Sequence, residues 1–287
     1  MISTFAAGAL VASVLFQATD TTIAVEDGMR LDLRNQTGEI RVTVWQRDAV
    51  RIIVRRPRGF RIDVERSGAV LRVRRVVARG FEDDIDDDAD VDFAITVPPY
   101  LDLDLSGVEV AVSVIGTAGD VSVETVEGAV LVRGGAGFVS VQSLDDDVRI
   151  EDARGRIHAT STGGNVWIRN VSGEVTAESI DGDIELDNVD ARQITANTVD
   201  GDVTFSGPIH DGGRYRFGTH DGDVTVWVPA GVNASVSVAT FEGEFETSFP
   251  VILRGSQRYR FNFTLGDGGA VLRMETFDGD IFLRRLR

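Results

Sequence analysis

The feature that most constrains this chain is a nine-residue unit, Gly-x-apolar-x-apolar-x-x-apolar-x, that recurs eight times without a gap. Apolar third and fifth positions alternate with solvent-tolerant residues, and this alternation predicts a strand with one buried face. The remaining positions supply a turn, where Gly and Asp-Gly adopt unusual backbone angles easily. The units begin at Gly119, Gly128, Gly137, Asp146, Gly155, Gly164, Gly173 and Gly182.

Each unit therefore encodes one strand and one corner, and its apolar face can be buried only against neighbouring units. Two units make a coil of about 18 residues with two flat sides, and stacked coils lie about 4.8 Å apart. We predict an all-β chain that forms a β-solenoid, similar to a parallel β-helix, with strand-rich N- and C-terminal caps. An antiparallel meander is the alternative, but identical chemistry at every corner favours continuous winding over alternating hairpins.

The rest of the chain suggests three parts. Residues 1–18 are apolar, with an uncharged run from Phe5 to Phe16, and resemble a signal peptide ending near Ala18. A mis-chosen start codon or a short first strand is the alternative for this segment. Residues 19–105 alternate without the Gly-initiated repeat and are predicted to form an N-terminal β cap region. Residues 106–287 are predicted to form the solenoid with its C-terminal cap, either separately or as one continuous domain with 19–105.

After Leu186 the register of the repeat drifts, although copies such as Gly222-Asp223-Val224 and Gly279-Asp280-Ile281 persist. Segments Pro208 to Tyr215 and Pro250 to Asp267 are expected to bulge out as loops. Aromatic residues are concentrated in this part of the chain, which predicts a wider core or a cap.

Charge and composition exclude several classes of function. The net charge of −17 disfavours nucleic acid and anionic membranes as partners, whereas cations and basic surfaces fit better. The absence of Cys excludes disulfides and thiolate chemistry. Only three histidines are present, His158, His210 and His220, and none accompanies a Ser in a nucleophile-elbow setting. We therefore expect no catalytic residues and no bound cofactor, with calcium as the one candidate considered below.

The recurring phrase Ser/Thr-x-Asp-Gly-Asp-Ile/Val-x-apolar ends in Thr276-Phe277-Asp278-Gly279-Asp280-Ile281. Together with the apolar-Pro step ahead of the repeats, it resembles the bacterial putative-adhesin (Toastrack) family of β-strand repeat proteins. The resemblance covers about residues 30–287. It implies an envelope-associated structural or adhesin-like role without a described catalytic site.

Two acidic groups are candidate calcium sites. Asp-Gly-Asp turns would place Asp181, Asp183, Asp200 and Asp202 at equivalent corners, where stacked carboxylates repel one another and a divalent cation would relieve the repulsion. The alternative is that Asp-Gly simply makes good turns. Residues 82–92 hold eight acids, among them Asp84, Asp86 and Asp88, loosely spaced like a calcium loop but without its central Gly. A solvated acidic loop is the alternative there.

An arginine-rich block, which includes Arg51, Arg66, Arg72, Arg74 and Arg75, precedes this acidic run and could pair with it or contact an anionic polymer.

From the sequence we expect an exported protein of the periplasm, outer-membrane surface or extracellular space, without a transmembrane span in the mature chain. Its expected partners are envelope proteins or polysaccharide. The rival hypothesis is a glycan-binding or glycan-acting protein on a β-helix scaffold, which would need a deep groove lined by convergent carboxylates and aromatic rings.

Overall fold

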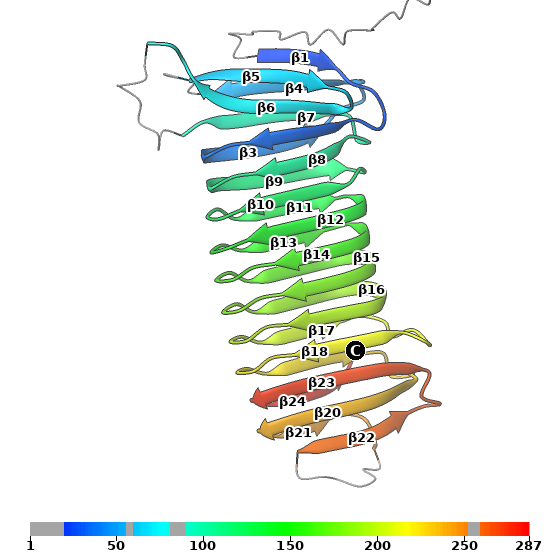
Figure 1. Ribbon diagram of the computed structural model, residues 1–287. Coiled ribbons are helices and arrows are strands. Elements are labelled where there is room, and N and C mark those ends of the chain that lie inside the picture. The colour runs from blue at the N-terminus through cyan, green and yellow to red at the C-terminus, as the bar shows by residue number, and fades with distance from the viewer. Residues whose placement is uncertain (1–19, 56–59, 81–89, 252–258, 287) are drawn as a thin grey trace, which may run out of the picture.

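A computed structural model describes residues 20–55, 60–80, 90–251 and 259–286 of the chain. These residues form strands β1 to β24 and no helix, so no described helix could cross a membrane. The strands are stacked into one elongated rod (Figure 1). The prediction of an all-β chain is confirmed. The predicted signal peptide lies outside the described residues.

The middle of the rod is a two-faced stack in which alternate strands pair in parallel. Val121 of β10 lies opposite Val139 of β12, and Val130 of β11 lies opposite Val148 of β13, an offset of 18 residues in both cases. Consecutive units therefore lie on opposite faces, and the chain winds once for every two units, although β15 and β16 each continue through a bend and contribute to both faces. The strands here are β8 (Asp102–Ser106), β9 (Glu109–Thr117), β10 (Val121–Thr125), β11 (Val130–Gly134), β12 (Ala136–Ser143), β13 (Val148–Glu151), β14 (Arg154–Thr160), β15 (Val166–Glu178), β16 (Ile184–Asn197), β17 (Val203–Ser206), β18 (Arg214–Gly218) and β19 (Val224–Val228).

The core is a narrow apolar interior between the two faces. The third-position and fifth-position residues of the units, such as Val121, Val123 and Val132, are fully buried. In the C-terminal coils aromatic rings replace valine, and Phe205 stacks on Phe217 with ring centroids 4.9 Å apart. Because burial of each such side chain contributes about 1.5–3 kcal/mol, stacking of the repeats supplies most of the driving force for folding.

The N-terminal end of the rod continues both faces before antiparallel strands close it. β2 (Arg30–Arg34) pairs in parallel with β8, and β3 (Thr37–Val44) pairs in parallel with β9. β6 (Val70–Val77) and β7 (Asp92–Val97) form the next layer outward. Three strands then pair antiparallel on this end: β1 (Asp20–Ala24), β4 (Ala49–Arg55) and β5 (Phe60–Ser67).

The C-terminal end differs from the order that the sequence suggests. β23 (Ala270–Asp278) and β24 (Ile281–Arg285) insert directly after β18 and β19, and β20 (Ala234–Glu242) and β21 (Phe245–Thr247) lie beyond them. The last copy in sequence is therefore not the last in space. β22 (Arg260–Leu265) pairs antiparallel with β20 and ends the stack.

The prediction that Pro250 to Asp267 is a loop was therefore wrong over β22. Phe263 and Leu265 alternate with exposed residues and are buried, which gives this segment the pattern of a strand with one covered face. The other predicted loop, Pro208 to Tyr215, is irregular only as far as Gly213, because β18 begins at Arg214.

Candidate functional site

One edge of the stack carries the acidic turns, and we call it the acidic edge. It consists of the turns at residues 107–109, 126–129, 144–147, 162–165, 180–183, 199–202, 220–223, 277–280 and 241–244. In each of these turns the chain passes from one face to the other through a narrow loop (Figure 1).

A buried hydroxyl precedes most of these turns and holds one coil to the coil before it. The Ser179 hydroxyl donates to the carbonyl oxygen of Gly164 at 3.0 Å and accepts from the amide of Gly182 at 3.2 Å. Thr198 donates to the carbonyl of Gly182 at 2.9 Å in the next coil. The Ser/Thr of the repeated phrase is therefore a structural residue, because it satisfies backbone groups that the turn leaves unpaired.

Most turns of this edge require glycine because adjacent turns lie in backbone contact, although the turn at 144–147 has another residue, Asp146, at that position. A Cβ on Gly182 would overlap the carbonyl oxygen of Gly164, and a Cβ on Gly201 would press on the carbonyl of Gly182. Neither obstacle is a flexible side chain, so relief would require the coils to separate.

The second Asp of each Asp-Gly-Asp turn accepts a hydrogen bond from the next coil. The Asp183 carboxylate accepts from the amide of Asp202 at 2.8 Å, and the Asp202 carboxylate accepts from the amide of Asp223 at 2.8 Å. The same bond continues from Asp280 to the Asp223 carboxylate at 2.7 Å. Sequence reasoning missed this role, although the strict spacing of the second Asp was a signal for it.

The calcium candidates separate into three groups in the structure. Asp183 and Asp202 belong to the hydrogen-bonded ladder and Asp181 and Asp200 lie beside it, and all four residues are exposed. Asp84, Asp86 and Asp88 lie outside the described residues. Within the described ranges, no three Asp, Glu or His side chains converge as metal ligands would. Calcium binding at the acidic edge stays a prediction.

The opposite edge, which we call the asparagine edge, is built differently. It consists of the bends at residues 116–118, 134–136, 152–154, 170–172 and 188–190. Asp152, Asn170 and Asn188 have φ angles of 55°, 53° and 52°, a left-handed conformation that Asn and Asp tolerate better than most residues. The Asn188 amide donates to the Asn170 side chain at 2.9 Å, and the Asn170 amide donates to Asp152 at 3.3 Å.

The apolar residue at the eighth position of the repeat is buried at the asparagine edge and exposed at the acidic edge. Val171 and Val189 follow the left-handed residues and turn inward, with 2% and 0% of their surface exposed. Val126, Leu144 and Ile180 point outward at the acidic edge, with 38%, 46% and 47% exposed. The sequence presented these residues as one apolar column, and the structure divides them between the core and the surface.

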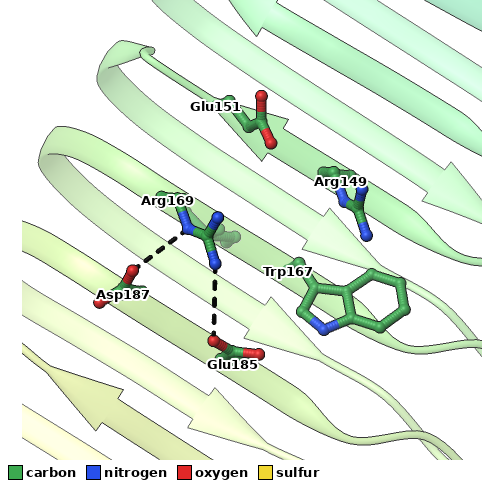
Figure 2. Close-up of a pocket in the computed structure, with 7 residues that line it drawn as sticks. Arg149, Glu151, Trp167, Arg169, Glu185 and Asp187 are labelled. Carbon is green, nitrogen blue, oxygen red and sulfur yellow. Dashed lines mark ion pairs between the residues drawn. The ribbon is translucent and has the colours of Figure 1, made fainter.

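A charged hollow lies on the face formed by β13, β15 and β16 (Figure 2). The Arg149 guanidinium lies over the Trp167 ring, 4.9 Å from its centroid. Arg169 pairs with Asp187 at 3.2 Å and with Glu185 at 3.9 Å. The hollow encloses about 240 Å³, below the range of about 300–1,000 Å³ that is typical of small-molecule sites. Its carboxylates pair with Arg169 and with Arg133 beside the hollow, and Arg149 covers the ring.

A larger, open hollow of about 720 Å³ lies between β20 and β22 at the C-terminal end. Ser235, Asn262 and Phe263 are among the residues that line it, and none of the lining residues that the structure describes is ionisable. These residues therefore offer hydrogen bonds and apolar contact, but no acid or base.

The three histidines lie apart and have different partners. His210 contacts Asp190 through Nε2 at 2.6 Å, His158 contacts the hydroxyl of Thr160 at 3.2 Å, and His220 stacks on Phe277. Beside His210, burial raises the pKa of Tyr215, whose hydroxyl donates to the Ala191 carbonyl at 2.8 Å.

Part of the arginine block pairs within the N-terminal end. Arg51 binds Asp20 at 2.6 Å, and this hydrogen bond lowers the pKa of Asp20. Arg72 and Arg74 share the Asp32 carboxylate, at 3.5 and 3.2 Å. The acidic run that the sequence offered as their partner lies mostly outside the described residues, so that prediction stays open.

Comparison with known proteins gives one family, and the distant solved structures that match include the two that follow. A family model described as Toastrack DUF4097 matches residues 100–284. A "putative cell adhesion protein" from Clostridium sporogenes aligns over 93% of this chain and 99% of its own, with 9% identity and a TM-score of 0.26. A "Putative lipid binding protein" from Parabacteroides distasonis aligns over 93% and 96%, with 11% identity and a TM-score of 0.34. Likenesses this weak establish no function. None of the curated proteins matches the chain.

Proposed function

Because the chain belongs to the Toastrack family, we propose that it is a non-catalytic structural or adhesin-like protein of the bacterial cell envelope. In this proposal residues 1–18 direct its export, and the remaining chain forms a regular solenoid of nine-residue units. Its partners are envelope proteins or polysaccharide.

One observation carries the proposal: the parallel pairing repeats from β2 to β24, so the stack is elongated along one axis (Figure 1). Each added coil lengthens the rod by about 4.8 Å. Charged side chains that could act in catalysis, such as Asp183 and Arg169, are instead bonded to neighbouring coils. This arrangement supports a role in which length and repeated surface matter.

Export is tested by fractionation of cells that express the tagged chain from its own start. We expect the protein in the envelope or the medium, with a mature N-terminus near residue 19. A full-length chain confined to the cytoplasm would refute the proposed location.

Regular winding is tested by deletion of whole coils. Removal of residues 155–172, which is two units, joins Arg154 to Gly173 and keeps every side chain on its face. We expect this variant to fold with a shorter rod. Removal of residues 155–163 alone exchanges the two edges and is expected to prevent folding. If both variants fold equally well, the edges are interchangeable and the coil is not the structural unit.

Glycan binding is the second candidate, because Trp167 lies among carboxylates on an outer face. A sugar would have to displace Arg149 from the ring. Quenching or enhancement of Trp fluorescence by cell-wall glycans, lost in Trp167→Ala, would favour this candidate. Trp45 and Trp227 would contribute an unchanged background in that experiment.

A further inference from the structure

The acidic edge carries a continuous line of exposed apolar side chains, which we call the apolar line. Successive members lie on adjacent coils: the amide of Val199 bonds to the carbonyl of Ile180, and the amide of His220 bonds to the carbonyl of Val199. Thr162 and His220 complete the line between its apolar members. Those members are Val108, Val126, Leu144, Ile180, Val199, Phe277 and Phe241.

This line is a concentration of exposed apolar surface. Of the twelve large hydrophobic side chains that are exposed among the described residues, seven belong to it. Val171 and Val189 occupy the same eighth position of the repeat at the asparagine edge, and they are buried. An apolar residue at this position is therefore not exposed by the repeat as such, but only at the acidic edge. Extended exposed apolar patches on soluble proteins commonly mark interaction sites.

At the C-terminal end the line becomes aromatic. His220 stacks on Phe277 with centroids 4.9 Å apart, Phe277 on Phe241 at 5.0 Å, and Phe241 on Tyr259 at 4.5 Å. The rings cover one another's faces and leave edges exposed. A partner would therefore meet a row of apolar edges, not a flat stacking platform.

The charge beside the line is uniformly negative. An acid directly follows most members, and the turns of the acidic edge contain no Arg, although the chain has 29 basic residues. An anionic bilayer or a nucleic acid would be repelled here. A second copy placed line against line would oppose carboxylate to carboxylate. The acids that follow the line are Glu109, Glu127, Asp145, Asp181, Asp200, Asp221, Asp278 and Glu242.

We propose that the apolar line and its flanking carboxylates bind a cationic amphipathic segment of a partner protein, laid along several coils. The apolar side of the segment covers the line, and its Lys or Arg side chains meet the carboxylates. Peptide binding by the purified protein does not depend on where the protein is located in the cell. Binding can therefore be absent while the proposed envelope role is correct, and binding can be present while the proposed envelope role is wrong.

The probe is a fluorescent Lys/Leu amphipathic peptide of about 18 residues, long enough as a helix to span about five coil spacings. Its binding to the purified chain is followed by anisotropy at low and at high NaCl. A scrambled peptide of the same composition keeps the charge and loses the apolar face. We expect saturable binding of the amphipathic peptide and at least about tenfold weaker binding of the scrambled one.

Two variants separate the apolar and ionic contributions. The triple change Leu144→Ser, Ile180→Ser and Val199→Ser is expected to weaken binding about tenfold at both salt concentrations. Its matched control changes Ile115, Phe138 and Val271, which are similarly exposed elsewhere, to Ser and is expected to alter binding less than about twofold.

The ionic variant changes Asp145, Asp181 and Asp200 to Ser. It is expected to weaken binding at low salt and to reduce its salt dependence. Its control, with Glu65, Asp90 and Asp267 changed to Ser, removes the same charge elsewhere and should bind normally. Circular dichroism confirms that each variant is folded.

Three results would overturn the proposal. Equal weakening by the apolar variant and its control would mean that the line is not the site. Loss of binding only in the ionic variant would reduce the effect to general charge attraction. Self-association in sedimentation experiments that disappears in the apolar variant would assign the line to a second copy of the chain.

Discussion

The two edges of this rod turn the same chain by different physical means. At the acidic edge the turn lies against the preceding coil, so it needs Gly and a buried hydroxyl to satisfy the backbone. At the asparagine edge one residue adopts a left-handed conformation and the strand continues through the bend, as in β15 and β16 (Figure 1). Close backbone contact limits both edges, since a Cβ on Gly173 beside the asparagine edge would overlap the carbonyl oxygen of Gly155, and the asparagine edge adds a residue in a left-handed conformation. The same substitution should therefore have different costs at the two edges.

The largest expected effect comes from adding a single methyl group at the acidic edge. Gly182→Ala forces Cβ into the Gly164 carbonyl, and we expect a loss of about 3 kcal/mol in the free energy of unfolding. Denaturant titration measures this loss. Gly231→Ala, whose Cβ would meet nothing within 4 Å, should change stability by no more than about 0.5 kcal/mol. Equal effects at both positions would show that close backbone contact does not control this edge.

A smaller effect is expected from removal of a buried hydroxyl. Ser179→Ala leaves the amide of Gly182 and the carbonyl of Gly164 without their partner, at a cost of about 1–2 kcal/mol. Ser172→Ala, at the asparagine edge and only half buried, serves as the control and should be near neutral. Thermal and chemical unfolding of both variants provide the measurement. A neutral Ser179→Ala would mean that water replaces the hydroxyl.

How far the sequence reveals the fold depends on how local the cause is. Strand positions and burial of the Val121 and Val123 columns follow from alternation within one unit, and these were predictable. The burial of Val171 and the exposure of Ile180 were not predictable, because they depend on the preceding residue, which is Asn170 in a left-handed conformation in one case and the buried Ser179 in the other. The distinction has a period of 18 residues and is invisible in a nine-residue pattern.

The order of the strands along the stack could not be predicted from the sequence either. β23 pairs with both β18 and β20, and a repeat pattern does not say that the last copy inserts between earlier strands. For the candidate site, the acids of the turns were predictable as a group at one edge. That Asp183 accepts a backbone amide of the next coil and Asp181 does not could not be predicted, since both residues are exposed and flank the same glycine.

At the asparagine edge the expected ranking is reversed, with glycine tolerated and alanine costly. Asn170→Ala keeps a Cβ in a left-handed conformation and loses the side-chain ladder, at a cost of about 1 kcal/mol. Asn170→Gly loses the ladder but relieves the backbone, so its cost should be smaller. Unfolding free energies of the two variants give the order. If Asn170→Gly is the more damaging variant, the ladder and not the backbone angle controls this edge.

The smallest expected effect is the response of the acidic edge to cations. Stacked carboxylates such as Asp181 and Asp200 repel one another weakly in water, so added NaCl should stabilise the fold by a few tenths of a kcal/mol through screening.

Asp183 and Asp202 already accept backbone amides, which lowers their availability as calcium ligands. We therefore expect CaCl2 and NaCl at equal ionic strength to give the same melting temperature, and calorimetric titration of calcium to give no saturable heat. A higher melting temperature in CaCl2, abolished by Asp181→Ser with Asp200→Ser, would instead make the acidic edge a calcium site. If the excess stabilisation survived that double change, the remaining candidates would be Asp183 and Asp202 and the acidic run with Asp84, Asp86 and Asp88.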